Sequence, residues 1–172
     1  MTLPLALLLT VVVGFPSSLL TATGEEIGWR GLLVPELAKR YNFSVTSLTS
    51  GIIWALFHYP AILFADYHSS APLWYAMIMF TIMAIAASFA FAWLRLKSGS
   101  LWTAAILHAS HNLFIQAIFD QLTLDFGLTP YLTTEFGVGL AAAYTLVAIY
   151  FWTRRGEVER VAGELRFVTP TG

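Results

Sequence analysis

The 172-residue sequence contains no cysteine and very little charge of either sign. The absence of cysteine excludes disulfides, thiolate nucleophiles and cysteine-based metal sites. Charged residues make up 11% of the chain, and the net charge of −1 provides no basic field of the kind that binds nucleic acid. No lysine or arginine precedes Arg30, so we do not expect a cleavable signal peptide, which needs a charged leading region.

Hydrophobic residues dominate the composition. They make up 58% of the chain, and the mean hydropathy is +0.71. A sequence this apolar cannot cover a water-facing surface, so we interpret it as an integral membrane protein. Five apolar stretches approach the ~20 residues that span a bilayer, and a sixth apolar segment carries charges. The five stretches are 3–23, 44–64, 73–94, 100–119 and 136–152, and the sixth is 25–40.

These segments predict an all-α polytopic membrane protein with about six transmembrane or membrane-embedded helices. We expect one membrane-embedded domain over residues 1–155 and a polar cytoplasmic tail over 156–172. A helix over residues 3–40 would be about 57 Å long, which is too long for one crossing. We therefore expect a break near Gly24, with an earlier kink at Gly14–Pro16.

The basic residues predict the orientation of these segments. The loops 65–72 and 120–135 contain no lysine or arginine, and eight of the nine basic residues fall on one side of a six-crossing arrangement. By the positive-inside rule, that side is cytoplasmic, which places both termini in the cytoplasm and the protein in the plasma membrane. The eight residues are Lys39, Arg40, Arg95, Lys97, Arg154, Arg155, Arg160 and Arg166.

A few polar residues lie deep inside the apolar segments. Ionisable groups are costly in hydrocarbon, so they normally face a cavity and a partner. Counted from the cytoplasmic ends at 1.5 Å per residue, Glu25 lies ~22 Å deep, His58 ~21 Å and Asn112 ~18 Å. Three distant segments thus place polar groups in one layer, which predicts a single site. Its candidate residues are Glu25, Glu26, Arg30, His58, His108 and Asn112.

Spacing along each helix refines this prediction. Residues four apart share a helix face, so Glu26 is expected to pair with Arg30, which leaves Glu25 free to point elsewhere. His111 lies outside this spacing, and we favour a structural role for it. Three pairs have the spacing of four: Glu26 with Arg30, Trp54 with His58, and His108 with Asn112.

Three segments together resemble a known family. They read GEEIGWRGLLVPELAKR (24–40), SGIIWALFHYPA (50–61) and GSLWTAAILHASHNLF (99–114). In this order they are similar to the E-E-x-x-x-R, F-x-x-x-H and H-x-x-x-N motifs of the CPBP intramembrane proteases, with Trp54 in the aromatic position. This group, also called the Abi family, includes type II CAAX prenyl endopeptidases and bacteriocin-processing enzymes. The resemblance covers about residues 24–118.

The resemblance implies an intramembrane endopeptidase that cleaves membrane-associated proteins or peptides. The residues suit the same chemistry, because amide hydrolysis needs an activated water and donors for the developing oxyanion. Glu25 is the candidate base, His58 its assistant, and His108 and Asn112 the oxyanion donors. The family acts on prenylated and on bacteriocin-like substrates, and nothing in the sequence selects between them.

Other interpretations remain open at this stage. Zinc could be held by Glu25, His58 and His108, since two histidines and a glutamate form a common catalytic zinc shell. We favour a metal-free mechanism, because Asn112 is a good hydrogen-bond donor and a poor zinc ligand. A transporter or proton relay could use the same buried groups, although the chain lacks the internal repeat of such proteins. A non-catalytic immunity or scaffold protein could also keep this fold.

Overall fold

The computed structural model describes residues 2–159, and within that range every regular element is helical. This confirms the all-α class predicted from the hydrophobic segments. In chain order the elements are α1 (Leu3–Glu26), the π-helix η1 (Ile27–Leu33), α2 (Val34–Ala38), α3 (Phe43–Phe64), α4 (Leu73–Ser98), α5 (Leu101–His111), the π-helix η2 (Asn112–Phe119), α6 (Asp120–Leu122), α7 (Thr129–Leu132) and α8 (Val138–Thr153).

Local sequence signals explain where several of these helices begin and end. The Asn42 side chain accepts a hydrogen bond of 3.0 Å from the Val45 amide and caps the start of α3. Ser100 caps α5 in the same way through the Trp102 amide. Gly99 ends α4 at φ +68°, a left-handed conformation that glycine adopts without steric cost. Gly99 and Ser100 together produce the tight turn between α4 and α5.

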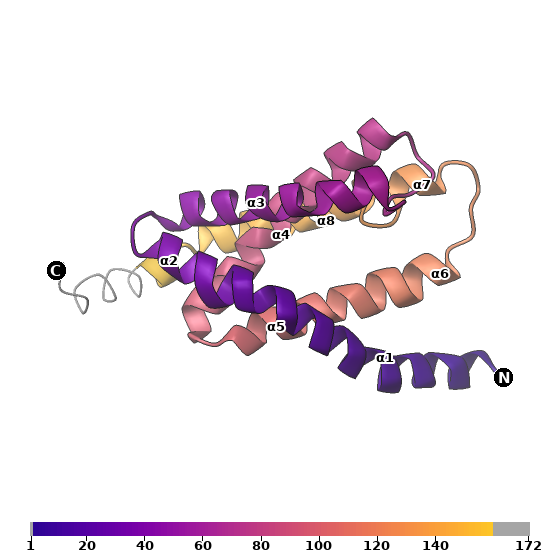
Figure 1. Ribbon diagram of the computed structural model, residues 1–172, viewed down its shortest axis with the longest axis horizontal. Helices are drawn as coiled ribbons and strands as arrows, with labels where there is room; N and C mark the ends of the chain where they lie inside the picture. The colour runs from indigo at the N-terminus through magenta and orange to yellow at the C-terminus, as the bar shows by residue number, and fades with distance from the viewer. Residues whose placement is uncertain (1, 160–172) are drawn as a thin grey trace.

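The helices form two groups with the polar residues between them. In one group α4 packs against both α3 and α8, and in the other α1 packs against α5 and η2 (Figure 1). The contact between α3 and α4 is close, because a Cβ atom added at Gly51 would lie 2.6 Å from the Ile85 Cα. Small residues at such positions let membrane helices approach each other closely, and Ser88 also lies at this contact.

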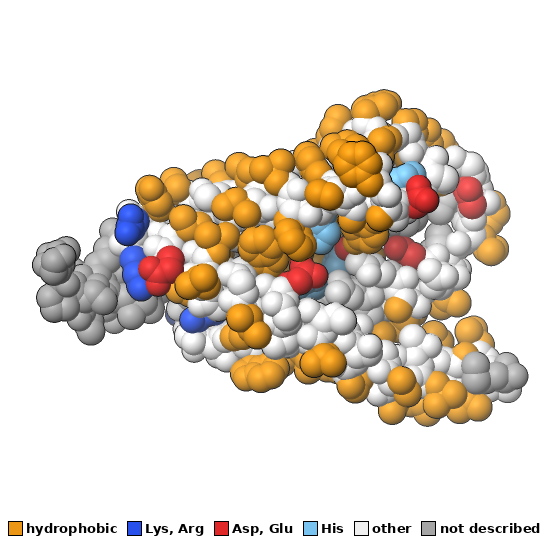
Figure 2. Space-filling view, viewed as in Figure 1, with side chains coloured by type: hydrophobic (Ala, Val, Ile, Leu, Met, Phe, Trp, Pro, Cys, Tyr) orange, Lys and Arg blue, Asp and Glu red, His pale blue; other side chains and the backbone are white. Residues whose placement is uncertain are grey.

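The face drawn in Figure 2 carries hydrophobic side chains along most of its length. Large hydrophobic side chains such as Leu20 and Phe64 are more than three-quarters exposed, which in water would be costly and in lipid is favourable. Three helical segments are long and apolar enough to cross a bilayer, namely Leu3–Ala38, Phe43–Phe64 and Leu73–Ser98. Together with the shorter apolar helices, they agree with a polytopic membrane protein.

The expected break near Gly24 is wrong. Residues Leu3–Ala38 form one continuous helical segment of 36 residues, which passes through the π-helical stretch η1 instead of reversing direction. Wider π-helical turns absorb a local irregularity without ending a helix. Figure 1 shows a change of direction within α1, and Pro16 is the proline inside that helix, as expected for a kink.

This continuity changes the arrangement of the chain ends. The prediction of both termini on one side required the chain to reverse near Gly24, and that reversal is absent. Figure 1 places the start of α1 and the end of α8 at opposite ends of the bundle. The lysines and arginines visible in Figure 2 gather at the end where α2 meets α3.

The predicted tail falls mostly outside the described residues. Its first part packs against this basic end, where Val158 is fully buried beside Val34 and Phe43. Lys97 also forms an ion pair of 2.9 Å with Glu157.

Candidate active site

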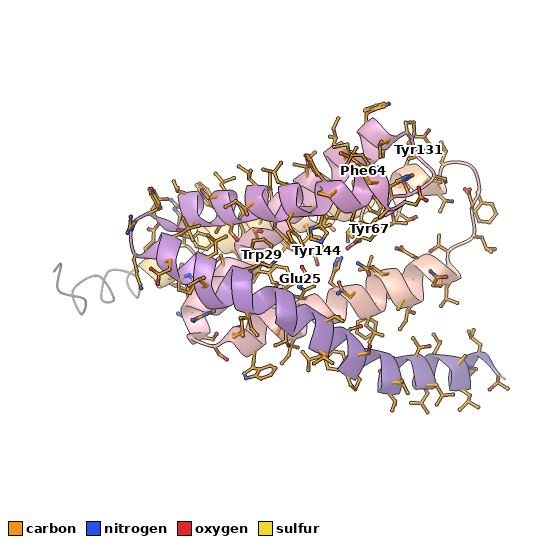
Figure 3. The ribbon with its side chains drawn as sticks, viewed as in Figure 1. Glu25, Trp29, Phe64, Tyr67, Tyr131 and Tyr144 are labelled. Atoms are coloured by element: carbon orange, nitrogen blue, oxygen red, sulfur yellow. The ribbon has the colours of Figure 1, made fainter. Side chains whose placement is uncertain are left out.

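A cavity of about 280 Å³ lies between the two groups of helices. Figure 3 shows Glu25, Tyr67 and Tyr144 in this middle region of the bundle. Four of the six candidate residues line the cavity, and they come from three helical segments that are distant in the sequence. The lining consists of Glu25, Trp54, His58, Ala61, Tyr67, Phe80, Met83, His108, His111, Asn112, Gln116 and Glu135.

Glu25 and Glu26 form the last two residues of α1, immediately before η1. Consecutive helical residues point about 100° apart, so the two carboxylates have different surroundings. Glu25 is half-buried and lines the cavity, where its Oε2 accepts a 3.4 Å hydrogen bond from Trp54 Nε1. Glu26 is fully buried and is absent from the cavity wall. Only the first of the two carboxylates is therefore placed to meet a substrate.

Glu26 lies behind the cavity wall and binds two side chains, those of Arg30 and His108. Its Oε1 accepts hydrogen bonds from Arg30 Nη1 at 2.7 Å and from His108 Nδ1 at 2.9 Å. The pairing with Arg30 that the spacing predicted is thus present. The Arg30 guanidinium is also fully buried, and it packs against the rings of Trp54 and Phe91 at 4.7 and 4.3 Å from their centroids. These contacts give Arg30 a structural position rather than a place in the cavity.

His58 is held by the backbone of its own helix. Its Nδ1 lies 2.9 Å from the Trp54 carbonyl oxygen. A carbonyl only accepts hydrogen bonds, so Nδ1 carries the hydrogen, and in the neutral ring Nε2 is the acceptor. The ring packs against Trp54 and Phe80, with centroid distances of 5.8 and 5.2 Å. The aromatic neighbour predicted one turn below His58 is therefore in contact with it.

His108 and Asn112 come from the junction between α5 and η2. His108 is 4% exposed, and its Nδ1 is occupied by Glu26, which leaves Nε2 for the cavity. Asn112 is the first residue of η2, and among residues 2–159 its side chain makes no hydrogen bond. Single π-helical turns are frequent at functional sites, because they change the direction of a side chain within a helix. The amide of Asn112 is thus available to a ligand in the cavity.

Sequence reasoning missed a second polar group on the cavity wall. Glu135, which the sequence places in an acidic outer loop, is 5% exposed and accepts a 2.5 Å hydrogen bond from His111 Nε2. Tyr67 donates to its other oxygen, and Gln116 donates to the Tyr67 hydroxyl at 3.3 Å. His111 also meets the Tyr144 hydroxyl through Nδ1 at 2.9 Å. A single glutamate in a polar loop gives no signal of this inward position.

The surroundings of Glu135 determine its charge. Burial alone would raise the pKa of this carboxyl, but hydrogen bonds from His111, Tyr67 and Gln116 and the charge of His111 outweigh burial and lower it. Burial and the adjacent carboxylate raise the pKa of Tyr67, so its hydroxyl stays protonated and donates. Glu135 is therefore an ionised acceptor at neutral pH.

Zinc binding at this site stays a prediction. Glu25, His58 and His108 share the cavity, but among residues 2–159 no group of three His, Cys, Asp or Glu side chains is arranged to hold a metal ion. The Nδ1 atoms of both histidines have partners, which leaves Nε2 of each ring for a ligand.

Comparison with known proteins identifies the family of the chain. The family model for Rce1-like type II CAAX prenyl endopeptidases matches residues 4–114, which include all six candidate residues. A protein named CAAX prenyl protease 2 from Methanococcus maripaludis is 33% identical over 100 residues. That match covers 55% of this chain and 36% of the relative, so the chain spans little more than a third of that protein. No solved structure matches the chain. Since the family model covers well over half of the sequence, the chain belongs to the Rce1-like type II CAAX prenyl endopeptidase family.

Proposed function

We propose that this protein is an intramembrane endopeptidase that hydrolyses peptide bonds of membrane-associated proteins or peptides. The observation that carries the proposal is the meeting of Glu25, His58, His108 and Asn112 on one cavity between apolar helices. The family membership supports a protease, and the name of the Methanococcus maripaludis relative suggests a prenylated substrate. A scaffold protein would need neither the Glu25 carboxylate on the cavity wall nor the Asn112 amide beside it.

In the proposed reaction, Glu25 acts as the general base. It takes a proton from a water molecule whose oxygen then bonds to the scissile carbonyl carbon, which yields a tetrahedral oxyanion. His58 assists through Nε2, the ring nitrogen that accepts a hydrogen bond from the same water in the neutral tautomer. When the C–N bond breaks, the proton taken by Glu25 passes to the leaving amine. The hydrogen bond from Trp54 Nε1 fixes the carboxylate during these steps.

His108 and Asn112 are the proposed donors to the oxyanion. The Asn112 amide can donate in any protonation state of the site. His108 can donate from Nε2 only when its ring is doubly protonated, because Nδ1 already donates to Glu26. Glu26 Oε1 lies 2.9 Å from His108 Nδ1 and so fixes the orientation of the ring. Glu26 therefore serves the reaction indirectly, as a positioning residue for His108.

The proposal predicts a specific kinetic effect for Asn112→Ala. Removing one oxyanion donor typically lowers kcat by about 10²–10³-fold with little change in substrate binding. Cleavage of a membrane peptide library by the purified protein in lipid vesicles measures this, with Asp125→Asn in an exposed loop as the control variant. A wild-type protein that cleaves nothing, or that moves ions or protons instead, would overturn the proposal.

We further propose that the basic end of the bundle faces the cytoplasm and the start of α1 faces outward. The positive-inside rule supports this orientation, since no lysine or arginine precedes Arg30. The chain has no native cysteine, so single-cysteine labelling has no background. A cysteine at Ser70 should react with an impermeant reagent on intact cells, and one at Ser98 should not; both positions are exposed, so access does not confound the result. The reverse pattern would invert the orientation.

A further inference from the structure

His111 is held at both ring nitrogens, which is unusual for a residue of the cavity wall. Nδ1 meets the Tyr144 hydroxyl of α8 at 2.9 Å, and Nε2 meets Glu135 Oε1 at 2.5 Å. The ring is 8% exposed and lies 5.6 Å from the Tyr144 ring. A ring with both nitrogens engaged and one face covered has a single orientation. The backbone that carries it, at the last residue of α5, is fixed with it.

Glu135 is the residue that joins these contacts to the rest of the wall. Its two oxygens bind different elements: Oε1 binds His111 of α5, and Oε2 accepts from Tyr67 in the segment after α3. Tyr67 in turn lies beside His58, with ring centroids 6.2 Å apart. One buried carboxylate thus connects the segments of the second and third motifs, through Tyr67 beside His58 and through His111.

The loop that carries Glu135 is built to point it inward. Thr134, the residue before it, has φ +64°, a left-handed conformation that is uncommon for a residue with a branched side chain. Gly137, two residues after it, has no room for a side chain, because a Cβ atom there would lie 2.0 Å from the Thr133 oxygen. Such strain persists only where the surroundings fix it, and it is frequent at functional sites.

The third motif is therefore anchored at two points. Glu26 of α1 holds His108, and Glu135 of the loop before α8 holds His111. Asn112 follows directly, at the change from α-helix to π-helix, and among the described residues its side chain has no hydrogen bond. The position of its amide depends on the turn that His111 fixes. The family match ends at residue 114, so Glu135 lies outside the matched motifs.

We infer that Glu135 is a positioning residue of the active site, which fixes Asn112 through His111 so that the amide faces the reacting carbonyl. The inference rests on the proposed function, and it assigns to Glu135 a role that acts through His111 and Asn112. A displacement of about 1 Å can lower a rate by about 10²-fold. Loss of Glu135 should therefore lower turnover without removing a reacting group.

A double-mutant cycle tests the inference kinetically. Glu135→Ala should lower kcat by about 10- to 10²-fold with KM nearly unchanged, and it should add little in an Asn112→Ala background, where no amide remains to be positioned. Glu135→Gln should recover part of the rate, because its amide oxygen still accepts from His111. Asp125→Asn, in the same connection but exposed, should leave kcat unchanged. Losses that multiply independently in the double variant would overturn the inference.

A second measurement does not depend on activity. Asn112→Cys places a single thiol in a chain without cysteine, and its reaction rate with a small water-soluble thiol reagent reports its position. Adding Glu135→Ala should change that rate severalfold, whereas adding Asp125→Asn should not. Ala84→Cys, buried in α4, should stay unreactive with Glu135→Ala if the protein is folded. An unchanged Asn112→Cys rate in the folded variant would overturn the inference, whether or not the protein is a protease.

Discussion

Glu25→Gln is expected to abolish measurable turnover while the protein still folds and binds peptide. The substitution keeps the size of the side chain, and the amide oxygen can still accept the hydrogen bond from Trp54 Nε1. It removes the base, and general base catalysis contributes about 10²–10⁴-fold to rates of this kind. Rates of peptide cleavage in lipid vesicles, together with peptide binding and thermal unfolding, measure the three quantities separately.

Glu36→Gln is the matched control, because Glu36 lies on the same continuous helix but is exposed and pairs with Lys39. It should leave kcat and KM unchanged. Substantial cleavage by Glu25→Gln would show that another group activates water. A loss of folding in Glu25→Gln would show that the carboxylate has a structural role.

Activity and metal content of four variants separate the metal-free mechanism from a zinc mechanism. In the metal-free mechanism, chelator treatment leaves activity unchanged, and elemental analysis of the active protein finds no stoichiometric metal. In a zinc mechanism, Glu25→Gln, His58→Ala and His108→Ala would each remove bound metal, whereas Asn112→Ala would not. Zinc that is stoichiometric, and whose removal and return stop and restore activity, would contradict the metal-free proposal.

The sequence predicted the fold class and the pairing behind the site because both depend on short-range rules. Apolar length gives the membrane helices, and a spacing of four places Glu26 beside Arg30. Counting depth from the cytoplasmic ends brought Glu25, His58 and Asn112 into one layer, and the structure places all three on one cavity. The count needed only the helical rise per residue.

What the sequence could not predict depends on packing between distant segments. Gly24 can end a helix, but here α1 continues through a π-helical stretch that packs against α5 and other neighbours, so tertiary contacts outweigh the local preference. The position of Glu135 is a second case. Its loop points inward because of the backbone at Thr134 and Gly137, and no residue spacing encodes that direction. His111 is a third case. The sequence predicts a structural role for it, because its partners Glu135 and Tyr144 lie outside α5 and no spacing within α5 indicates them.

Arg30→Ala is expected to lower the free energy of unfolding by about 3–5 kcal/mol, the range for a broken buried ion pair. The variant leaves the Glu26 carboxylate buried without its cation, and it removes the guanidinium that packs against Trp54 and Phe91. The result should fall toward the lower end of that range, because His108 still donates to the same carboxylate oxygen. Unfolding in detergent micelles measures the change.

A second substitution, Glu26→Gln, separates the effect of the buried charge on stability from the effect of side-chain packing. Adding Glu26→Gln to Arg30→Ala removes the uncompensated charge and should recover much of the lost stability, but not the part that comes from packing on the two rings. Lys39→Ala, which breaks the exposed pair with Glu36, is the matched control and should cost at most about 1 kcal/mol. A double variant no more stable than Arg30→Ala would mean that Glu26 and Arg30 do not couple. The stability of α1 at this point would then come from the aromatic contacts of Arg30 alone, and Glu26 would be held by His108.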